Sequence, residues 1–177
     1  MRILITNTSL IHRAGSELFV RDVALELLKR GHTPTLYSPR LGEVAEEIRR
    51  ATIPVTNNLN SVSVEPDIIH GQHHIEAMTA IAHFPNVPAI FFCHGMLPWA
   101  EIPPHHPRIF RYVAISEALQ DRLTHEYAIP DQMISMFSNF VDMERFKSRT
   151  DPLPDKPRKA LIFSTSLRTG NTSCGVP

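Results

Sequence analysis

The chain has 177 residues, enough for one ordinary domain with a short extension. Its 18 basic and 18 acidic side chains give a formal net charge of zero, which argues against a general affinity for nucleic acid or anionic membranes. Two cysteines, Cys93 and Cys174, are too few for a disulfide framework, and no apolar stretch approaches the length of a membrane span. We therefore expect a cytoplasmic protein.

Apolar periodicity and turn residues predict alternating strands and helices. In chain order these are a strand at 1–6, a helix at 16–30, a strand at 33–38, a helix at 41–51, strands at 53–55 and 66–70, a helix at 73–83, strands at 88–93 and 110–115, a helix at 116–127 and a strand at 134–137. This order predicts an α/β fold of the Rossmann-like, doubly wound kind, with a mostly parallel sheet and helices on both faces.

Three local features of these elements can be predicted. Pro34 is expected to precede the paired part of its strand, because proline has no N–H to donate. Ser16 and Ser116 are expected to be the N-caps of their helices. The helix at 73–83 is expected to bury one face whose residues recur at helical spacing, namely Ile75, Met78, Thr79 and Ala82.

Polar residues that follow strands are the candidates for chemistry. Gly15 ends the loop before the first helix, where an anion could bind the helix start; a simple turn is the other interpretation, because one glycine is a weak signal. His94 follows the most apolar strand, where it could bind a hydroxyl or move a proton, or else bind a backbone carbonyl. A metal site at His70, His73 and His74 is not expected, because no acidic or cysteine ligand is fixed nearby.

Five segments resemble, in the same order, the N-terminal half of the GT-B glycosyltransferases of family 4. They are RAGSELFVRDVALELLKRGHTPTLYSP, PDIIHGQHH, VPAIFFCHG, YVAISEALQDRL and IPDQMISMFSNFVDMERF. Together they cover residues 2–149. Two positions depart from the family pattern: Ala14 stands where the first glycine of Gly-Gly-x-Glu is usual, and Phe140 stands where glycine is common.

This resemblance implies a domain organisation. Residues 1–150 would be the acceptor-side domain, one half of a GT-B fold, in an enzyme that transfers a sugar from a nucleotide-sugar to an acceptor, usually with retention. Residues 151–177 would be a linker and the remnant of a second domain, with a strand at 159–165. Because the second domain of the family supplies most of the donor site, we expect this chain to be inactive alone.

The resemblance also implies roles for individual residues. The cleft loop with Gly15 and Ser16 would meet the phosphates of the donor, and His94 would be catalytic. The acceptor-binding residues would be His70, Gln72 and His73. The nucleotide-sugar is a co-substrate, and no cofactor and no metal are expected. The acceptor would be a sugar or a lipid-linked molecule. A peripheral membrane contact and a homodimer are further expectations, and nucleic acid is not an expected partner.

Two other classes of function stay open from the sequence. One is a Rossmann-like binding or interaction module without catalysis. The other is a different nucleotide-dependent Rossmann enzyme, such as an epimerase, although no G-x-G-x-x-G follows the first strand and no Tyr-x-x-x-Lys occurs. A serine hydrolase is not expected, because the chain has no G-x-S-x-G elbow.

Overall fold

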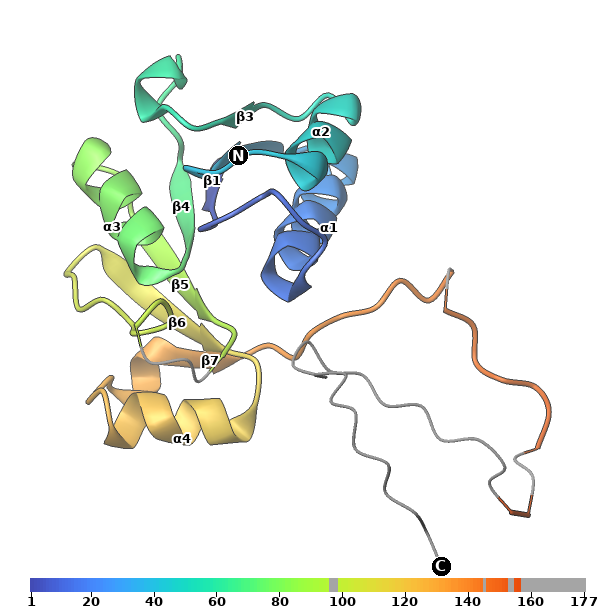
Figure 1. Ribbon diagram of the computed structural model, residues 1–177. Coiled ribbons are helices and arrows are strands. Elements are labelled where there is room, and N and C mark those ends of the chain that lie inside the picture. Colours follow the sequence, from blue (N-terminus) through green and yellow to red (C-terminus); the bar gives the residue numbers. More distant parts are fainter. Residues whose placement is uncertain (96–98, 145, 153–154, 157–177) are drawn as a thin grey trace, which may run out of the picture. The chain divides into compact units, whose positions relative to one another are not determined.

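A computed structural model describes residues 1–95, 99–144, 146–152 and 155–156 (Figure 1). Within these ranges seven parallel strands form one sheet in the order β3-β2-β1-β4-β5-β6-β7. The strands are β1 (Arg2–Thr6), β2 (Thr33–Tyr37), β3 (Val55–Thr56), β4 (Ile68–Gln72), β5 (Ala89–Cys93), β6 (Ile109–Ala114) and β7 (Ile134–Met136). The helices are α1 (Gly15–Lys29), α2 (Glu43–Arg50), α3 (His74–His83) and α4 (Glu117–His125), with short 3-10 turns η1 (Leu59–Ser61) and η2 (Asp131–Met133).

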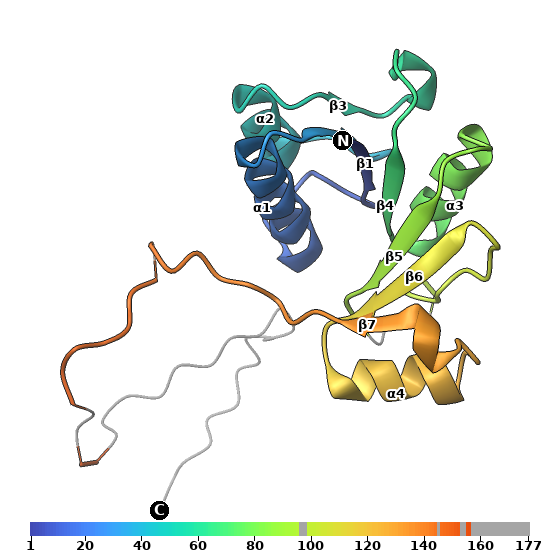
Figure 2. The same ribbon diagram turned by 180° about the vertical axis from the view of Figure 1, so that it is seen from behind.

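The helices cover both faces of the sheet, which confirms the predicted fold class. Helices α1 and α2 lie on one face and α3 and α4 on the other, as the two opposite views show (Figures 1 and 2). Each face has its own apolar core, and β1 contributes to both of them. Ile3 and Ile5 pack with α1 and α2, whereas Leu4 packs with α3 and α4. This alternation follows from the two-residue period of a strand.

The chain divides into two compact units, residues 1–140 and 141–177. The sheet and its helices belong to the first unit. In the second unit, the described contacts include a hydrogen bond from the Glu144 N–H to Asp142 Oδ1 at 2.9 Å. The domain boundary at residue 150 stays a prediction, and the predicted strand at 159–165 lies outside the described residues. No helix in the described ranges is both long and apolar enough to cross a membrane.

The prediction that Pro34 precedes the paired part of its strand is wrong. Pro34 lies inside β2, in register with Ile3 of β1. The nitrogen of Pro34 faces the β3 side, as does that of Leu36, which donates to the Pro54 carbonyl at 2.9 Å. Because β3 pairs with β2 only from Leu36 onward, the missing N–H of Pro34 leaves no gap in the hydrogen-bonded ladder.

The predicted buried face of α3 is also wrong, whereas Ser116 is confirmed as the N-cap of α4. Ile75 is 60% exposed, and the residues that α3 buries are Glu76, Ala77, Ala80 and Ile81. The reason is Gly71 of β4: a Cβ built there would lie 2.9 Å from the Cβ of Ala77. The helix packs so close to the strand that Ala77 faces Gly71, which leaves Ile75 on the exposed side and Met78 partly buried against the core.

The strands β1 and β4 are joined at their carboxyl ends by a side chain. Their last paired residues are Ile5 and His70. Beyond this pair, the buried hydroxyl of Thr6 donates to the Gln72 carbonyl and accepts from the Gln72 N–H, both at 2.9 Å. A single hydroxyl thus satisfies the backbone donor and the backbone acceptor of Gln72.

Replacing Thr6 by valine should destabilise the domain strongly for so small a change. Valine has the same shape, but it leaves the buried N–H and C=O of Gln72 without a partner, at a cost of about 2 kcal/mol. Urea unfolding monitored by circular dichroism measures this loss. Thr6→Ser is the matched control: it keeps the hydroxyl and should lose only about 1 kcal/mol, for the missing methyl group. A Thr6→Val variant as stable as Thr6→Ser would contradict this account.

Candidate functional site

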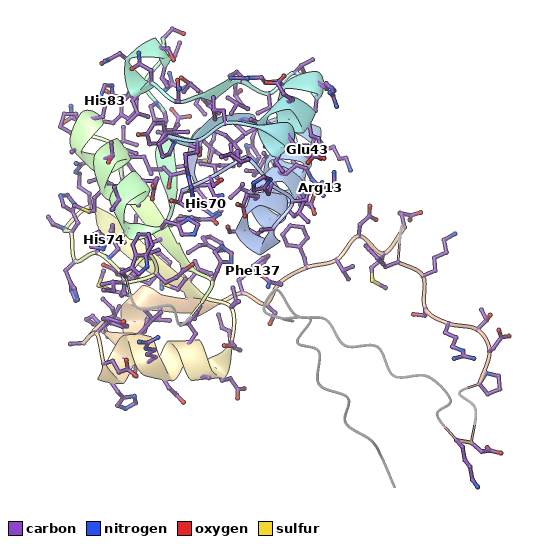
Figure 3. The ribbon with its side chains drawn as sticks, in the orientation of Figure 1. Arg13, Glu43, His70, His74, His83 and Phe137 are labelled. Carbon is purple, nitrogen blue, oxygen red and sulfur yellow. The ribbon has the colours of Figure 1, made fainter. Side chains whose placement is uncertain are left out.

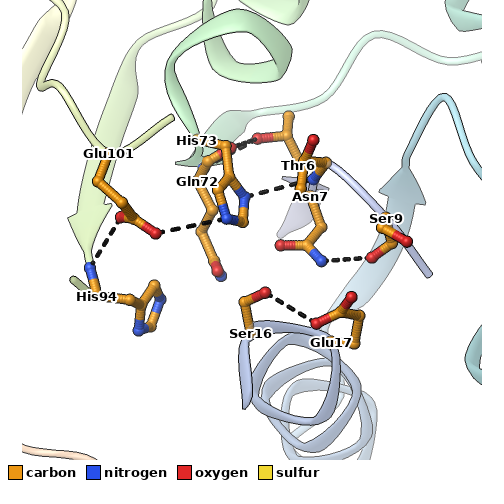
Figure 4. Close-up of polar contacts among 10 residues, drawn as sticks. Thr6, Asn7, Ser9, Ser16, Glu17, Gln72, His73, His94 and Glu101 are labelled. Atoms are coloured by element: carbon orange, nitrogen blue, oxygen red, sulfur yellow. Dashed lines mark hydrogen bonds and ion pairs between the residues drawn. The ribbon is translucent and has the colours of Figure 1, made fainter. Parts of the chain in front are cut away.

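The candidate site lies where the strand order reverses. From β1 the sheet grows toward β2 and β3 in one direction, and from β4 toward β5, β6 and β7 in the other. Loops after β1 and β4 therefore leave the sheet on opposite sides, and the carboxyl edge at such a point is the usual ligand site of these folds. Figure 4 shows the polar side chains that meet there, from the ends of β1, β4 and β5 and from the start of α1.

Helix α1 begins beside this edge, but Ser16 is not its N-cap. The cap is Ala14, whose carbonyl accepts from the Leu18 N–H at 3.0 Å, so that the helix begins at Gly15. Ser16 lies in the first turn, and its hydroxyl donates to the Glu17 carboxylate at 3.0 Å (Figure 4). Gly15 is exposed, and a Cβ built on it would meet no atom within 4 Å. Among the described residues, none therefore requires a glycine there.

His94 follows β5 and turns its ring toward α1. Its centroid lies 4.4 Å from that of Phe19 in an edge-to-face arrangement. Burial, and then the charge of His73, lower the pKa of His94 to about 4. Its Nε2 is buried and has no hydrogen-bond partner among the described residues. The site therefore contains a neutral imidazole with one buried ring nitrogen that no described residue hydrogen-bonds.

His70 is more deeply buried. It stacks on Phe92, with ring centroids 4.2 Å apart, and its Nε2 lies 3.4 Å from Gln72 Nε2. Burial, and then the charge of His94, lower the pKa of His70 to about 3. The predicted acceptor residues His70 and Gln72 thus lie together, at 5% and 0% exposure.

His74 is separate from this group (Figure 3). It begins α3, and its Nδ1 lies 2.9 Å from the Ile102 carbonyl oxygen. Within the described ranges no group of three histidine, cysteine, aspartate or glutamate side chains is placed to hold a metal ion.

His73 connects the loops after β1, β4 and β5. Its Nδ1 accepts from the Thr8 N–H at 3.3 Å, so that Nε2 carries the ring proton; this nitrogen lies 3.5 Å from Glu101 Oε1. Glu101 in turn accepts from the backbone N–H of His94 at 3.3 Å (Figure 4). The backbone of His73 has φ 60° and ψ 136°, a combination that side chains other than that of glycine rarely adopt. These side-chain contacts hold it there.

Three buried polar atoms at this edge lack a hydrogen-bond partner among the described residues: Asn7 Oδ1, Gln72 Oε1 and His94 Nε2. Gln72 and His94 are among the residues predicted from the sequence, whereas Asn7 and Glu101 are not. Asn7 could have been found, because it directly follows the first strand at the edge where ligands bind. Glu101 belongs to an irregular proline-rich loop, and no periodicity in the sequence indicates where that loop runs.

A separate hollow of about 610 Å³ lies elsewhere, between the amino-terminal half of β1 and β2 and the segment that follows β3. Its lining includes Arg2, Thr33, Thr35, Arg49 and Ser63. None of the three unpartnered atoms lines it. The arginines in its wall are already paired, Arg2 with Asp67 and Arg49 with Glu46. The carboxyl edge is therefore the better candidate.

Comparison with known proteins agrees with this architecture. The family model of Glycosyltransferase Family 4 matches residues 13–145. Comparison with curated protein sequences gives no match. Among solved structures, the chain is similar to a glycosyltransferase from Rickettsia africae ESF-5, with a TM-score of 0.65 and 20% identity over 82% of this chain and 45% of that chain. It is also similar to HepE from Anabaena, solved in complex with UDP and glucose, with a TM-score of 0.62 and 16% identity over 85% of this chain and 47% of that one.

The chain thus spans less than half the length of these two structures. At these identities the likeness shows a shared fold: the same parallel α/β architecture recurs in both proteins.

The buried histidines should make the domain sensitive to acid. Unfolded histidines titrate near pH 6.5, whereas burial lowers the folded pKa of His70 to about 3. As the pH falls below 6.5, the unfolded state binds protons that the native state does not bind, so stability is lost toward low pH. We expect His70 alone to lower the free energy of unfolding by about 1 kcal/mol per pH unit between pH 6 and pH 4.

Urea unfolding at a series of pH values measures this slope. His70→Gln retains a hydrogen-bonding group near the position of Nε2 and does not titrate, so its slope should be shallower. His83→Gln, at the exposed end of α3, is the matched control and should keep the slope of the natural chain. Equal slopes for all three proteins would show that His70 is not the source of the acid sensitivity.

Proposed function

Because the chain belongs to Glycosyltransferase Family 4, we propose that it forms the acceptor-side half of an enzyme that transfers a sugar from a nucleotide-sugar to an acceptor. The observation that carries this proposal is the neutral imidazole of His94, buried at the carboxyl edge with Nε2 unpartnered among the described residues. Such a nitrogen binds a sugar hydroxyl without adding charge to the site. His94 is the residue we assign to the reacting sugar.

The start of α1 is the proposed contact for the donor phosphates. The first N–H groups of a helix have no partner within the helix and carry part of the positive end of its dipole. Gly15 and Ser16 present these groups beside the edge that holds His94. The open space around Gly15 among the described residues supports this role, since it leaves room for a ligand at the helix start. The nucleotide-sugar acts as co-substrate, and we propose no cofactor and no metal.

The acceptor is assigned to the group formed by His70, Gln72 and His73. His70 stacks on Phe92, and Gln72 is fully buried, so neither residue adds an exposed charge to the site. Their contribution is to shape the carboxyl edge and offer hydrogen bonds there. We expect the 177-residue chain alone to bind ligands without transferring sugar, because in this family a second domain supplies most of the donor site. A cytoplasmic location, a peripheral membrane contact and a homodimer stay predictions.

Ligand titration tests the proposed function directly. A ligand that binds only the native state raises the melting temperature. UDP-, GDP- and ADP-sugars and the bare nucleotides are compared by thermal shift and calorimetry, and UDP-glucose is tested first because HepE was solved with UDP and glucose. Saturable binding of one nucleotide-sugar is the expected result. The proposed contact between the start of α1 and the donor phosphates fails if none of these ligands binds. A radiolabel transfer assay tests separately the expectation that the chain alone is inactive.

Gly15→Ala tests the contact with the phosphates. The added methyl group enters open space and favours the helix, so the melting temperature without ligand should be unchanged or slightly higher. It would hold a phosphate away from the helix start, and we expect the Kd of the nucleotide-sugar to rise about tenfold, which corresponds to about 1.4 kcal/mol. Lys29→Ala, at the far end of α1, is the matched control with an unchanged Kd. If Gly15→Ala also left the Kd unchanged, the phosphates would lie elsewhere.

A further inference from the structure

We propose that the edge between β1 and β4 binds an uncharged, hydroxyl-donating part of the acceptor, and that it disfavours phosphate and carboxylate groups. This inference rests on the proposed function and narrows its acceptor to a sugar that is neutral where it enters the site. It follows from the buried carboxamides of Asn7 and Gln72. In each, the nitrogen has a contact within the protein, whereas the oxygen has no partner among the described residues.

The carboxamide of Asn7 has a defined orientation. Its Nδ2 donates to the Ser9 carbonyl at 2.6 Å, and the opposite orientation would place two acceptor oxygens against each other. The residue is fully buried, and Oδ1 has no partner among the described residues. The protein therefore uses the donor end of Asn7 and leaves its acceptor end unsatisfied.

Gln72 is placed similarly on the neighbouring strand. Its Nε2 lies 3.4 Å from Nε2 of His70, which accepts a hydrogen bond when the proton of this buried neutral ring is on Nδ1. Its backbone is fixed by the Thr6 hydroxyl, and Oε1 is unpartnered in the part of the chain that the structure describes. Figure 4 shows the side chains of Asn7 and Gln72 near each other at the carboxyl edge, with His94 on one side of them and Ser16 on the other.

Two buried acceptors without a donor select the chemistry of the ligand. A buried unpaired oxygen is costly, and a group that donates a hydrogen bond to it removes that cost. A sugar hydroxyl donates as well as accepts, whereas an ionised phosphate or carboxylate mainly accepts and would face these two oxygens unfavourably. The unpartnered oxygens of Asn7 and Gln72 thus match a neutral molecule that carries several hydroxyl groups.

The charge of Glu101 favours the same ligand. Its side chain is 10% exposed, and it accepts from the backbone N–H of His94 at 3.3 Å. This carboxylate would repel an anion bound beside His94 at this short range. Two arginines lie in the neighbouring loops, but Arg13 pairs with Glu47, and Nε of Arg40 lies 3.4 Å from the Thr8 carbonyl oxygen that accepts from it.

Paired ligands that differ only in charge test this inference. Saturation-transfer NMR on the full chain compares glucose with glucuronate and with glucose 6-phosphate, and the same is done with the matching galactose and mannose derivatives. At least one neutral sugar should bind about tenfold more tightly than its charged counterparts. Equal or tighter binding of the charged forms overturns the inference, and so does the absence of binding by every neutral sugar.

Gln72→Met separates a ligand-binding role from a structural one. Methionine has a similar length and removes the unpartnered oxygen, so the melting temperature should stay unchanged or rise while the affinity for the neutral sugar falls at least about tenfold. A lower melting temperature with unchanged sugar affinity would make Gln72 a structural residue only and overturn the inference.

Glu101→Gln tests the charge. It keeps an acceptor for the backbone N–H of His94, and we expect it to reduce severalfold the discrimination against glucose 6-phosphate. Glu26→Gln, on α1 and 47% exposed, is the matched control that should leave the discrimination unchanged. Unchanged discrimination in Glu101→Gln would show that this charge does not select the ligand.

The nucleotide-sugar titration on the same samples separates the two proposals. If neutral sugars bind selectively and no nucleotide-sugar binds, the donor contact proposed at the start of α1 fails and the neutral subsite stands. If a nucleotide-sugar binds while neutral and charged sugars bind alike, the donor contact stands and the neutral subsite is wrong.

Discussion

The site depends on one hydroxyl group at the point where β1 and β4 part. Thr6 binds both backbone groups of Gln72 after the regular pairing of the two strands has ended. A chain that turns away from a sheet must still satisfy its backbone polar groups, and here a side chain does this in place of a strand. Asn7 directly follows Thr6 in the chain, and Gln72 is the residue that Thr6 binds. This junction therefore holds both side chains at the carboxyl edge of the sheet.

The loops at this edge are tied to one another before any ligand is present. His73 contacts Thr8 on one side and Glu101 on the other, and Glu101 holds the backbone of His94. These contacts use the N–H groups of Thr8, His73 and His94. The oxygens Asn7 Oδ1 and Gln72 Oε1, in contrast, have no hydrogen-bond partner among the described residues. Such an arrangement favours binding because little order has to be gained when the ligand arrives. It also keeps the site uncharged where His94 lies, because burial opposes protonation of its ring.

Much of the fold could be predicted, because strands buried on both faces need apolar runs whichever helix covers them. The ends of such strands are visible in sequence, which is why Gln72 and His94 were candidates. The orientation of α3 was not predictable, because it depends on how closely Gly71 lets that helix approach. Ser16 is predicted to cap α1, but it lies inside the first turn and its hydroxyl donates to Glu17 instead. Glu101 reaches the site through a loop whose path depends on tertiary contacts.

The strained backbone of His73 has a consequence for how this position can change in evolution. Its φ and ψ values are close to those that glycine alone adopts easily, and holding another residue there costs about 1–3 kcal/mol. A glycine would relieve this strain but would cut the links to Thr8 and Glu101 at once. Selection for a more stable domain and selection for a preassembled ligand edge therefore oppose each other here. If related chains keep a histidine at this position, then the contacts that preassemble the ligand edge have been retained there at the expense of stability.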